Sequence, residues 1–147
     1  MRMEDRSSVS STYFSELDAT FLKRLQEIPI FTTLPFDLTQ AADGIAEMAL
    51  PFQHEFSGIF ESMHGGMLMA LADTVACVAV LSKTGPNAMV TTTDMNIRFL
   101  SACRSKATAK ARIIKFGRSL VPVQVDILDE TGTLVAVAQV TYMRLRA

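Results

Sequence analysis

The sequence predicts an α+β fold in which an antiparallel sheet of about five to six strands is wrapped around one long helix. Three observations support this prediction. Nearly every residue between Met67 and Ser82 is apolar or small. After Pro86, apolar and polar residues alternate over several stretches, which is the period of half-buried strands. Short turns separate these stretches, so consecutive strands are expected to pair as an antiparallel meander.

The central helix is expected from about Gly65 to about Lys83. This segment is rich in Ala, Leu and Met, which favour helices, and Gly85 followed by Pro86 is typical of a helix end. A helix that is apolar on all sides must be buried on all sides. It also contains an acid and has too few apolar residues for a membrane span, so the rest of the chain is expected to surround it.

The remaining elements follow from periodicity and turn residues. Residues 1–40 are expected to hold an N-terminal helix from Ser15 to Gln26 and, from Ile30 to Gln40, a loop with one short helix. Residues 41–147 are expected to form the sheet and the central helix, beginning with a strand from Ile45 to Phe56. Later strands are expected at 94–99, 106–113, 121–127 and 133–145, with turns at 117–118 and 129–132.

Composition narrows the possible functions. The net charge is −1 with both signs interspersed, which argues against nucleic-acid binding. The chain has two cysteines and two histidines without a ligand spacing, so no metal site is expected. It shows no signal-peptide pattern, and a cytoplasmic protein without a membrane anchor is expected.

Asp73 is the charged residue within the apolar helix. A buried carboxylate is costly unless it is paired or hydrogen-bonded. Asp73 therefore either binds a water or pairs with an arginine at a subunit contact, or it is kept for acid, base or nucleophilic chemistry. At the helix start stand His64, Gly65 and Gly66. The first N–H groups of a helix lack intrahelical acceptors, and glycines let a ligand come close enough to use them for a developing oxyanion.

The spacing of Gly65 and Asp73 has a consequence for assembly. Eight residues of helix separate them by about 12 Å along the axis, too far for one carbonyl group to touch both. Two antiparallel helices related by a two-fold axis would bring Asp73 of each chain near Gly65 of the other. The sequence therefore predicts a homodimer with two sites shared across the interface.

Two segments resemble a known family. The helix start HGGMLMALAD, residues 64–73, and the strand TTTDMNIRF, residues 91–99, resemble the hotdog-fold acyl-CoA thioesterases, with the phenylacetate-degradation subgroup the most similar. The resemblance covers residues 43–142. It implies edge-to-edge homodimers, often assembled as dimers of dimers, and hydrolysis of acyl-CoA substrates without a cofactor.

The resemblance also implies roles for individual residues. Asp73 would act as general base toward water or as nucleophile, and the amide of Gly65 would polarise the thioester carbonyl. His64 would stand beside that loop, and the Thr92 hydroxyl would orient the water in the same chain as Asp73.

Substrate contacts are expected from Gly66, Gly58 and Arg118, the last toward the CoA phosphates. Many family members carry Asn or Gln six or seven residues before this histidine or glycine. Here Gly58 stands six residues before His64, and a shifted Gln53 or His54 is the alternative.

Two other functions remain open at this stage. A hotdog hydratase or dehydratase would need a histidine paired with Asp73, and none follows it in the sequence. A non-catalytic acyl-CoA binder would agree with the missing upstream amide. Release of free thiol from a panel of acyl-CoA esters would separate hydrolysis from binding.

Overall fold

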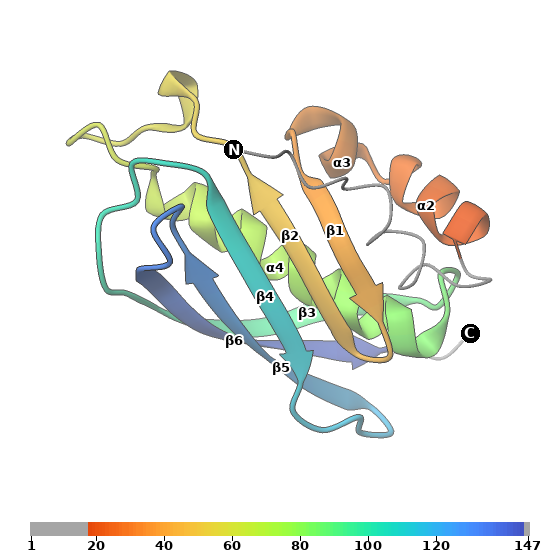
Figure 1. Cartoon of the computed structure of the whole chain (residues 1–147). Helices are drawn as coiled ribbons and strands as arrows, with labels where there is room; N and C mark the ends of the chain where they lie inside the picture. Colours follow the sequence, from red (N-terminus) through yellow and green to blue (C-terminus); the bar gives the residue numbers. More distant parts are fainter. Residues whose placement is uncertain (1–17, 146–147) are drawn as a thin grey trace.

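The computed structural model describes residues 18–145, in which a six-stranded antiparallel sheet curves around helix α4 (Gly65–Thr84) (Figure 1). The strand order is β1-β2-β4-β5-β6-β3, so β1 and β3 are the two edges of the sheet. The other elements are α2 (Asp18–Gln26), α3 (Pro29–Thr33), β1 (Asp37–Ala42), β2 (Ile45–Leu50), the 3₁₀ turn η1 (His54–Phe56), β3 (Val90–Phe99), β4 (Ala107–Ile113), β5 (Leu120–Leu128) and β6 (Leu134–Arg144).

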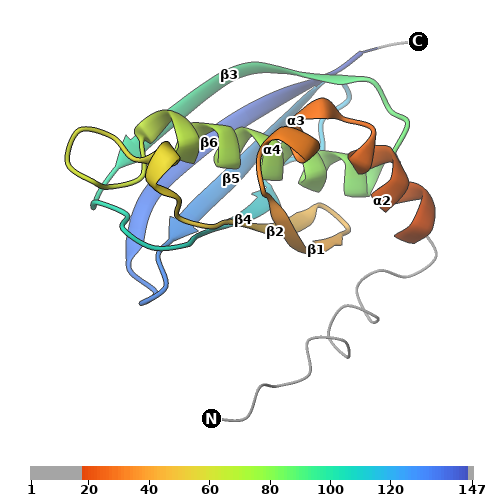
Figure 2. The same ribbon diagram turned by 90° about the horizontal axis from the view of Figure 1, so that it is seen from above.

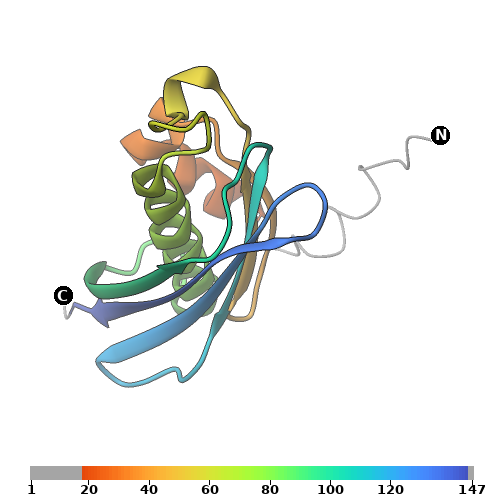
Figure 3. The same cartoon turned by 90° about the vertical axis from the view of Figure 1, so that its left-hand side faces the viewer.

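Helix α4 lies in the concave face of the sheet, and α2 and α3 lie on the same side of the sheet (Figures 2 and 3). The expected central helix is confirmed, with His64 as N-cap and Gly85 at φ 102° after the last turn. By length and composition α4 could cross a membrane, so the expectation that it has too few apolar residues for a span was wrong. Its apolar residues instead pack against the strands, so it is the core helix of this fold.

The sheet approaches α4 closely through small residues. Ala107, Ala109 and Ala111 of β4 are all buried, and they alternate with polar residues on the outer face. Valines and one isoleucine of β5 fill the same face next to them. Because alanine adds only a methyl group, the helix can lie near the strand without leaving a cavity.

Strand β1 corrects the expectation of a loop from Ile30 to Gln40. The burial of its side chains alternates only weakly, as expected at a sheet edge, so the hydrophobic pattern of the sequence did not indicate a strand here. It forms a hairpin with β2, and both turn residues, Asp43 and Gly44, have positive φ angles of 48° and 85°. Asp-Gly at such a turn is a strong hairpin signal that the loop prediction left out.

Two further expectations were wrong in detail. The strand expected to run to Phe56 ends at Leu50, directly before Pro51, which cannot donate to the ladder. The expected meander holds for β4, β5 and β6, but β3 pairs with β6 at the far edge instead of with β4. The expected helix start at Ser15 lies outside the described residues, and the division between residues 1–40 and 41–147 stays a prediction.

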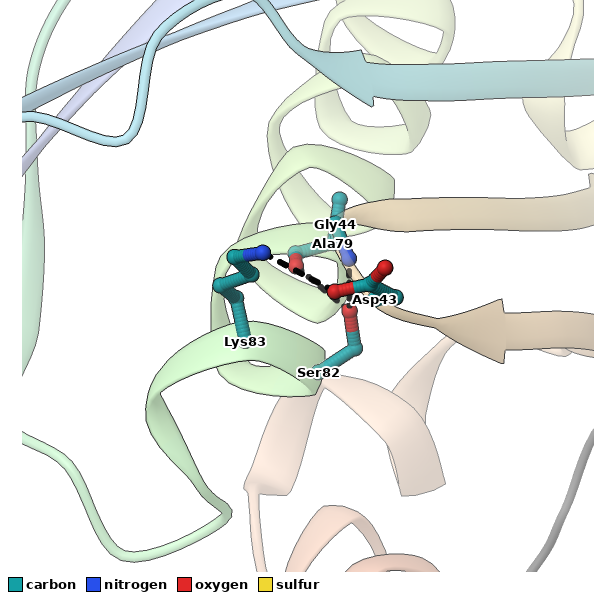
Figure 4. Close-up of polar contacts among 5 residues, drawn as sticks. All are labelled: Asp43, Gly44, Ala79, Ser82 and Lys83. Carbon is teal, nitrogen blue, oxygen red and sulfur yellow. Dashed lines mark hydrogen bonds and ion pairs between the residues drawn. The ribbon is translucent and has the colours of Figure 1, made fainter.

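The turn between β1 and β2 is fastened to the end of α4 (Figure 4). The buried Gly44 N–H donates to Ser82 Oγ at 2.9 Å, and the Ser82 hydroxyl donates to the Ala79 carbonyl at 2.7 Å. Lys83 Nζ lies 2.9 Å from Asp43 Oδ1, and both of these side chains are exposed. The turn of the hairpin is therefore held to α4 by one partly buried hydrogen bond and one exposed ion pair.

We expect Ser82→Ala to lower the free energy of unfolding by about 1–3 kcal/mol, because the buried Gly44 N–H loses its acceptor. Lys83→Ala is the matched control, since an exposed ion pair contributes less than about 1 kcal/mol. Urea unfolding followed by circular dichroism measures both. A larger effect for Lys83→Ala would contradict this assignment.

Candidate functional site

The carboxylate of Asp73 is held through one of its two oxygens. The Thr92 hydroxyl donates to Asp73 Oδ1 at 2.7 Å, and the Tyr142 hydroxyl donates to the same atom at 2.8 Å. The tyrosine oxygen also lies 2.9 Å from the Asp73 backbone carbonyl. No group within residues 18–145 donates to Oδ2. One carboxylate oxygen is thus anchored, and the other is available to a ligand.

A β-bulge in β3 turns the side chain of Thr92 toward Asp73. The pairing of β3 with β6 shifts register between Thr92 and Asp94, which leaves Thr93 as an extra residue. After the bulge, Met95 and Ile97 face the core. Strict alternation would then place Thr92 on the outer face, and the single-residue shift turns it toward α4 instead.

Tyr142 is the functional-site residue that the sequence analysis missed. It is the last buried residue of β6 and is only 5% exposed. The one available signal was an aromatic hydroxyl at the end of an inward apolar series that includes Ala138 and Val140. A buried tyrosine hydroxyl needs a hydrogen-bond partner, but the sequence does not show which partner lies opposite.

Cys77 lies one helical turn beyond Asp73 on α4, since it stands four residues later in the sequence. Burial raises the pKa of the Cys77 thiol from the ordinary 9.0 to about 11. Burial, together with the nearby Cys77 and Asp73, likewise raises the pKa of Tyr142. Both groups are therefore neutral at physiological pH, and the phenol keeps the proton that it donates to Asp73.

The raised pKa of Cys77 predicts a loss of stability at alkaline pH. The folded state favours the neutral thiol, so this stabilisation is complete below about pH 9 and is lost as the pH rises toward 11. Cys77→Ala should weaken the dependence over this window. The check is the urea midpoint at several pH values between about 8 and about 9.5, below the ordinary tyrosine pKa of about 10. An identical slope in wild type and variant would contradict the prediction.

The start of α4 presents a free amide. Gly66 N–H donates to His64 Nδ1 at 2.8 Å, so His64 caps the helix through its side chain. A Cβ on Gly66 would lie 2.9 Å from that nitrogen, which explains the glycine. Within residues 18–145, the Gly65 N–H has no hydrogen-bond acceptor. It lies at the positive end of the helix dipole.

Beside this amide lies a pocket of about 470 Å³. Its lining is about equally polar and apolar and comes from the start of α4, the end of β3 and the loop that follows β3. The residues are Ser62, Met63, Gly65, Leu68, Phe99, Leu100, Ser101, Ala102 and Cys103. The Phe99 ring packs so closely that a Cβ on Gly65 would lie 3.1 Å from it. Gly65 therefore lines an open pocket that is large enough for part of a ligand.

The other residues that were expected to contact substrate do not line this pocket. Gly58 packs against His64, and a Cβ there would lie 3.7 Å from the imidazole. Gln53 and His54 are exposed at η1, and Arg118 is exposed on the connection between β4 and β5. No group of three or more potential metal ligands occurs within the described part of the chain.

The structure thus contains two partial sites in one chain. Asp73, Thr92 and Tyr142 meet at the middle of α4, whereas His64, Gly65 and Gly66 lie at its start. Two helical turns separate the groups, and the pocket at Gly65 does not include Asp73.

Comparisons with known proteins agree with this architecture. Residues 60–136 match the family model described as the thioesterase superfamily, a range that includes Gly65, Asp73 and Thr92 but ends before Tyr142. Human acyl-coenzyme A thioesterase 13 is 28% identical over 102 residues, which cover 67% of this chain and 72% of that protein.

Solved structures show the same fold. A thioesterase of Haemophilus influenzae superposes with a TM-score of 0.77 at 28% identity, covering 85% of this chain and 88% of that one. The PaaI protein of the E. coli phenylacetic acid degradation operon gives a TM-score of 0.79 at 20% identity, covering 95% and 97%. This likeness concerns the fold alone. From the family match and these relatives we conclude that the chain belongs to the thioesterase superfamily and has its hotdog fold.

Proposed function

We propose that this protein hydrolyses acyl-CoA thioesters with Asp73 as the reacting carboxylate. The observation that supports this most directly is the anchored carboxylate on the core helix of a thioesterase fold, with Oδ2 left available. The name of the human relative, an acyl-coenzyme A thioesterase, points to the CoA thioester as substrate class. A neighbouring structure from Streptococcus pneumoniae contains coenzyme A.

The chemistry needs no group beyond the chain and water. Asp73 Oδ2 takes a proton from water as the water oxygen adds to the thioester carbonyl carbon. The resulting oxyanion accepts a hydrogen bond from the partner's Gly65 amide. The tetrahedral intermediate then expels the CoA thiolate, which takes the proton from Asp73. The products are the free acid and CoA. In the alternative, Asp73 attacks the carbonyl carbon and expels the CoA thiolate, which leaves a mixed anhydride. Water then attacks the aspartyl carbonyl and releases the free acid, and one turnover in ¹⁸O water by this route labels the Asp73 carboxylate.

The free edge of β3 supports a site shared between two chains. This strand has ten residues, and no strand within residues 18–145 pairs with its outer edge. Long exposed edges tend to pair with another strand. Thr92, near one end of β3, holds Asp73, whereas Phe99, at the other end, packs on Gly65. Antiparallel pairing of two β3 edges about a two-fold axis would therefore bring the Asp73 end of each chain to the Gly65 end of its partner.

The proposal also covers substrate contacts. The pocket at Gly65 has Met63, Leu68 and Phe99 among its lining residues and suits an apolar acyl group. Arg118 is exposed and available to the CoA phosphates.

A thiol-release assay with short-chain, long-chain and aryl CoA esters tests the proposal. Release of CoA that disappears with Asp73→Asn supports it. Binding of acyl-CoA without release would favour a non-catalytic binder, in agreement with Gly58 at the position of the family amide. Hydration of an enoyl-CoA without thiol release would favour the hydratase alternative.

A further inference from the structure

We propose that Tyr142 is a positioning residue for the reaction, a role that rests on the proposed function of Asp73. Its hydroxyl and that of Thr92 donate to the same oxygen, Oδ1, from two different strands. Two donors on one oxygen fix the plane of the carboxylate, because rotation about either side-chain bond would break at least one hydrogen bond. The fixed orientation directs Oδ2 toward the attacking water.

The position of the tyrosine hydroxyl strengthens this assignment. It lies 2.8 Å from Asp73 Oδ1 and 2.9 Å from the Asp73 backbone carbonyl. It therefore ties the side chain to the backbone of the same residue. A phenol has only one proton, and the carboxylate is the stronger acceptor of the two. Pairing of Thr92 with Tyr142 in adjacent strands keeps the two hydroxyls at a constant separation.

The surroundings of the tyrosine keep its proton in place. Burial raises the pKa of Tyr142, so the phenol stays protonated and keeps the proton that it donates to Asp73. A purely structural tyrosine would not need to meet the reacting carboxylate on its anchored oxygen.

The test is Tyr142→Phe, which removes one oxygen atom and keeps the buried ring. We expect kcat to fall on the order of tenfold to a hundredfold, because a small misorientation of a reacting group costs this much, while KM changes less than about twofold. Thr141→Val is the matched control, because it removes a hydroxyl from the adjacent position of β6 without touching Asp73. It should keep the wild-type kcat. A Tyr142→Phe enzyme with unchanged kcat, or with only KM altered, would overturn the proposal.

A crystal structure of Tyr142→Phe separates this inference from the proposed function. The Asp73 carboxylate should be turned or disordered in the variant, whether or not the protein hydrolyses a tested thioester. An unchanged carboxylate would overturn the positioning role. Absence of hydrolysis by the wild type, with a turned carboxylate in the variant, would instead count against the proposed function alone.

Discussion

Asp73→Asn is expected to lower kcat for thioester hydrolysis by on the order of 10²–10⁴-fold, the usual contribution of a general base. The substitution keeps an oxygen that can accept from Thr92 and Tyr142, and it removes the charge and the proton acceptor. The fold should therefore survive, and acyl-CoA binding should change little. Thiol release under saturating substrate measures the loss, and thermal unfolding verifies that the variant is folded.

Asp126→Asn provides the control for this prediction. Asp126 is also a carboxylate of the described chain, but it is exposed on the outer face of β5 and meets only Gln124. Its replacement should leave kcat unchanged. A fully active Asp73→Asn protein would refute both base and nucleophile roles, and Asp73 would then be a structural residue in contact with β3 and β6.

The central helix could be predicted because its signal is strong and local. A long apolar run that ends at Gly85 and Pro86 leaves few alternatives to a buried helix. The alternating strands after it were predictable for the same reason, and the structure confirms them with shifts of a few residues. The position of β3 in the sheet was not predictable, because its pairing with β6 depends on contacts distant in sequence.

Residue patterns alone could not predict the face of β3 on which Thr92 lies. Its predicted role came from the family resemblance, whereas the alternation of Met95 and Ile97 alone places it on the outer face. The bulge at Thr93 reconciles the two by reversing the face of the strand. A run of threonines fits either arrangement, so the bulge could not be located from sequence.

The contact of Tyr142 with Asp73 could not be predicted for a different reason. Strand periodicity identifies which face a side chain occupies, but not which residue of another element lies against it. The hydrogen bonds from Tyr142 to Asp73 join residues 69 positions apart. Only the order of strands, with β6 between β5 and β3, brings this hydroxyl over the middle of α4.

A second variant tests whether the site is shared between chains. Gly65→Pro should remove the oxyanion donor and lower kcat by on the order of 10²–10³-fold. Proline is favoured at the first position of a helix, and the ψ of 137° at His64 suits a residue before proline. Gly65→Ala is the control. It keeps the amide N–H but places a Cβ 3.1 Å from the Phe99 ring, so it measures the steric part of the effect.

A heterodimer in which one chain carries Gly65→Pro and the other chain carries Asp73→Asn distinguishes a shared site from a site within one chain. In a shared arrangement, one site of the heterodimer carries both defects, and the other carries neither. Co-expression with two affinity tags and tandem purification should then yield about half of the wild-type activity per dimer, although each homodimer is inactive. If each site belonged to a single chain, every site would carry one defect, and the heterodimer would be as inactive as its parents. Recovery of activity can therefore arise only when the carboxylate of one chain works with the helix start of the other.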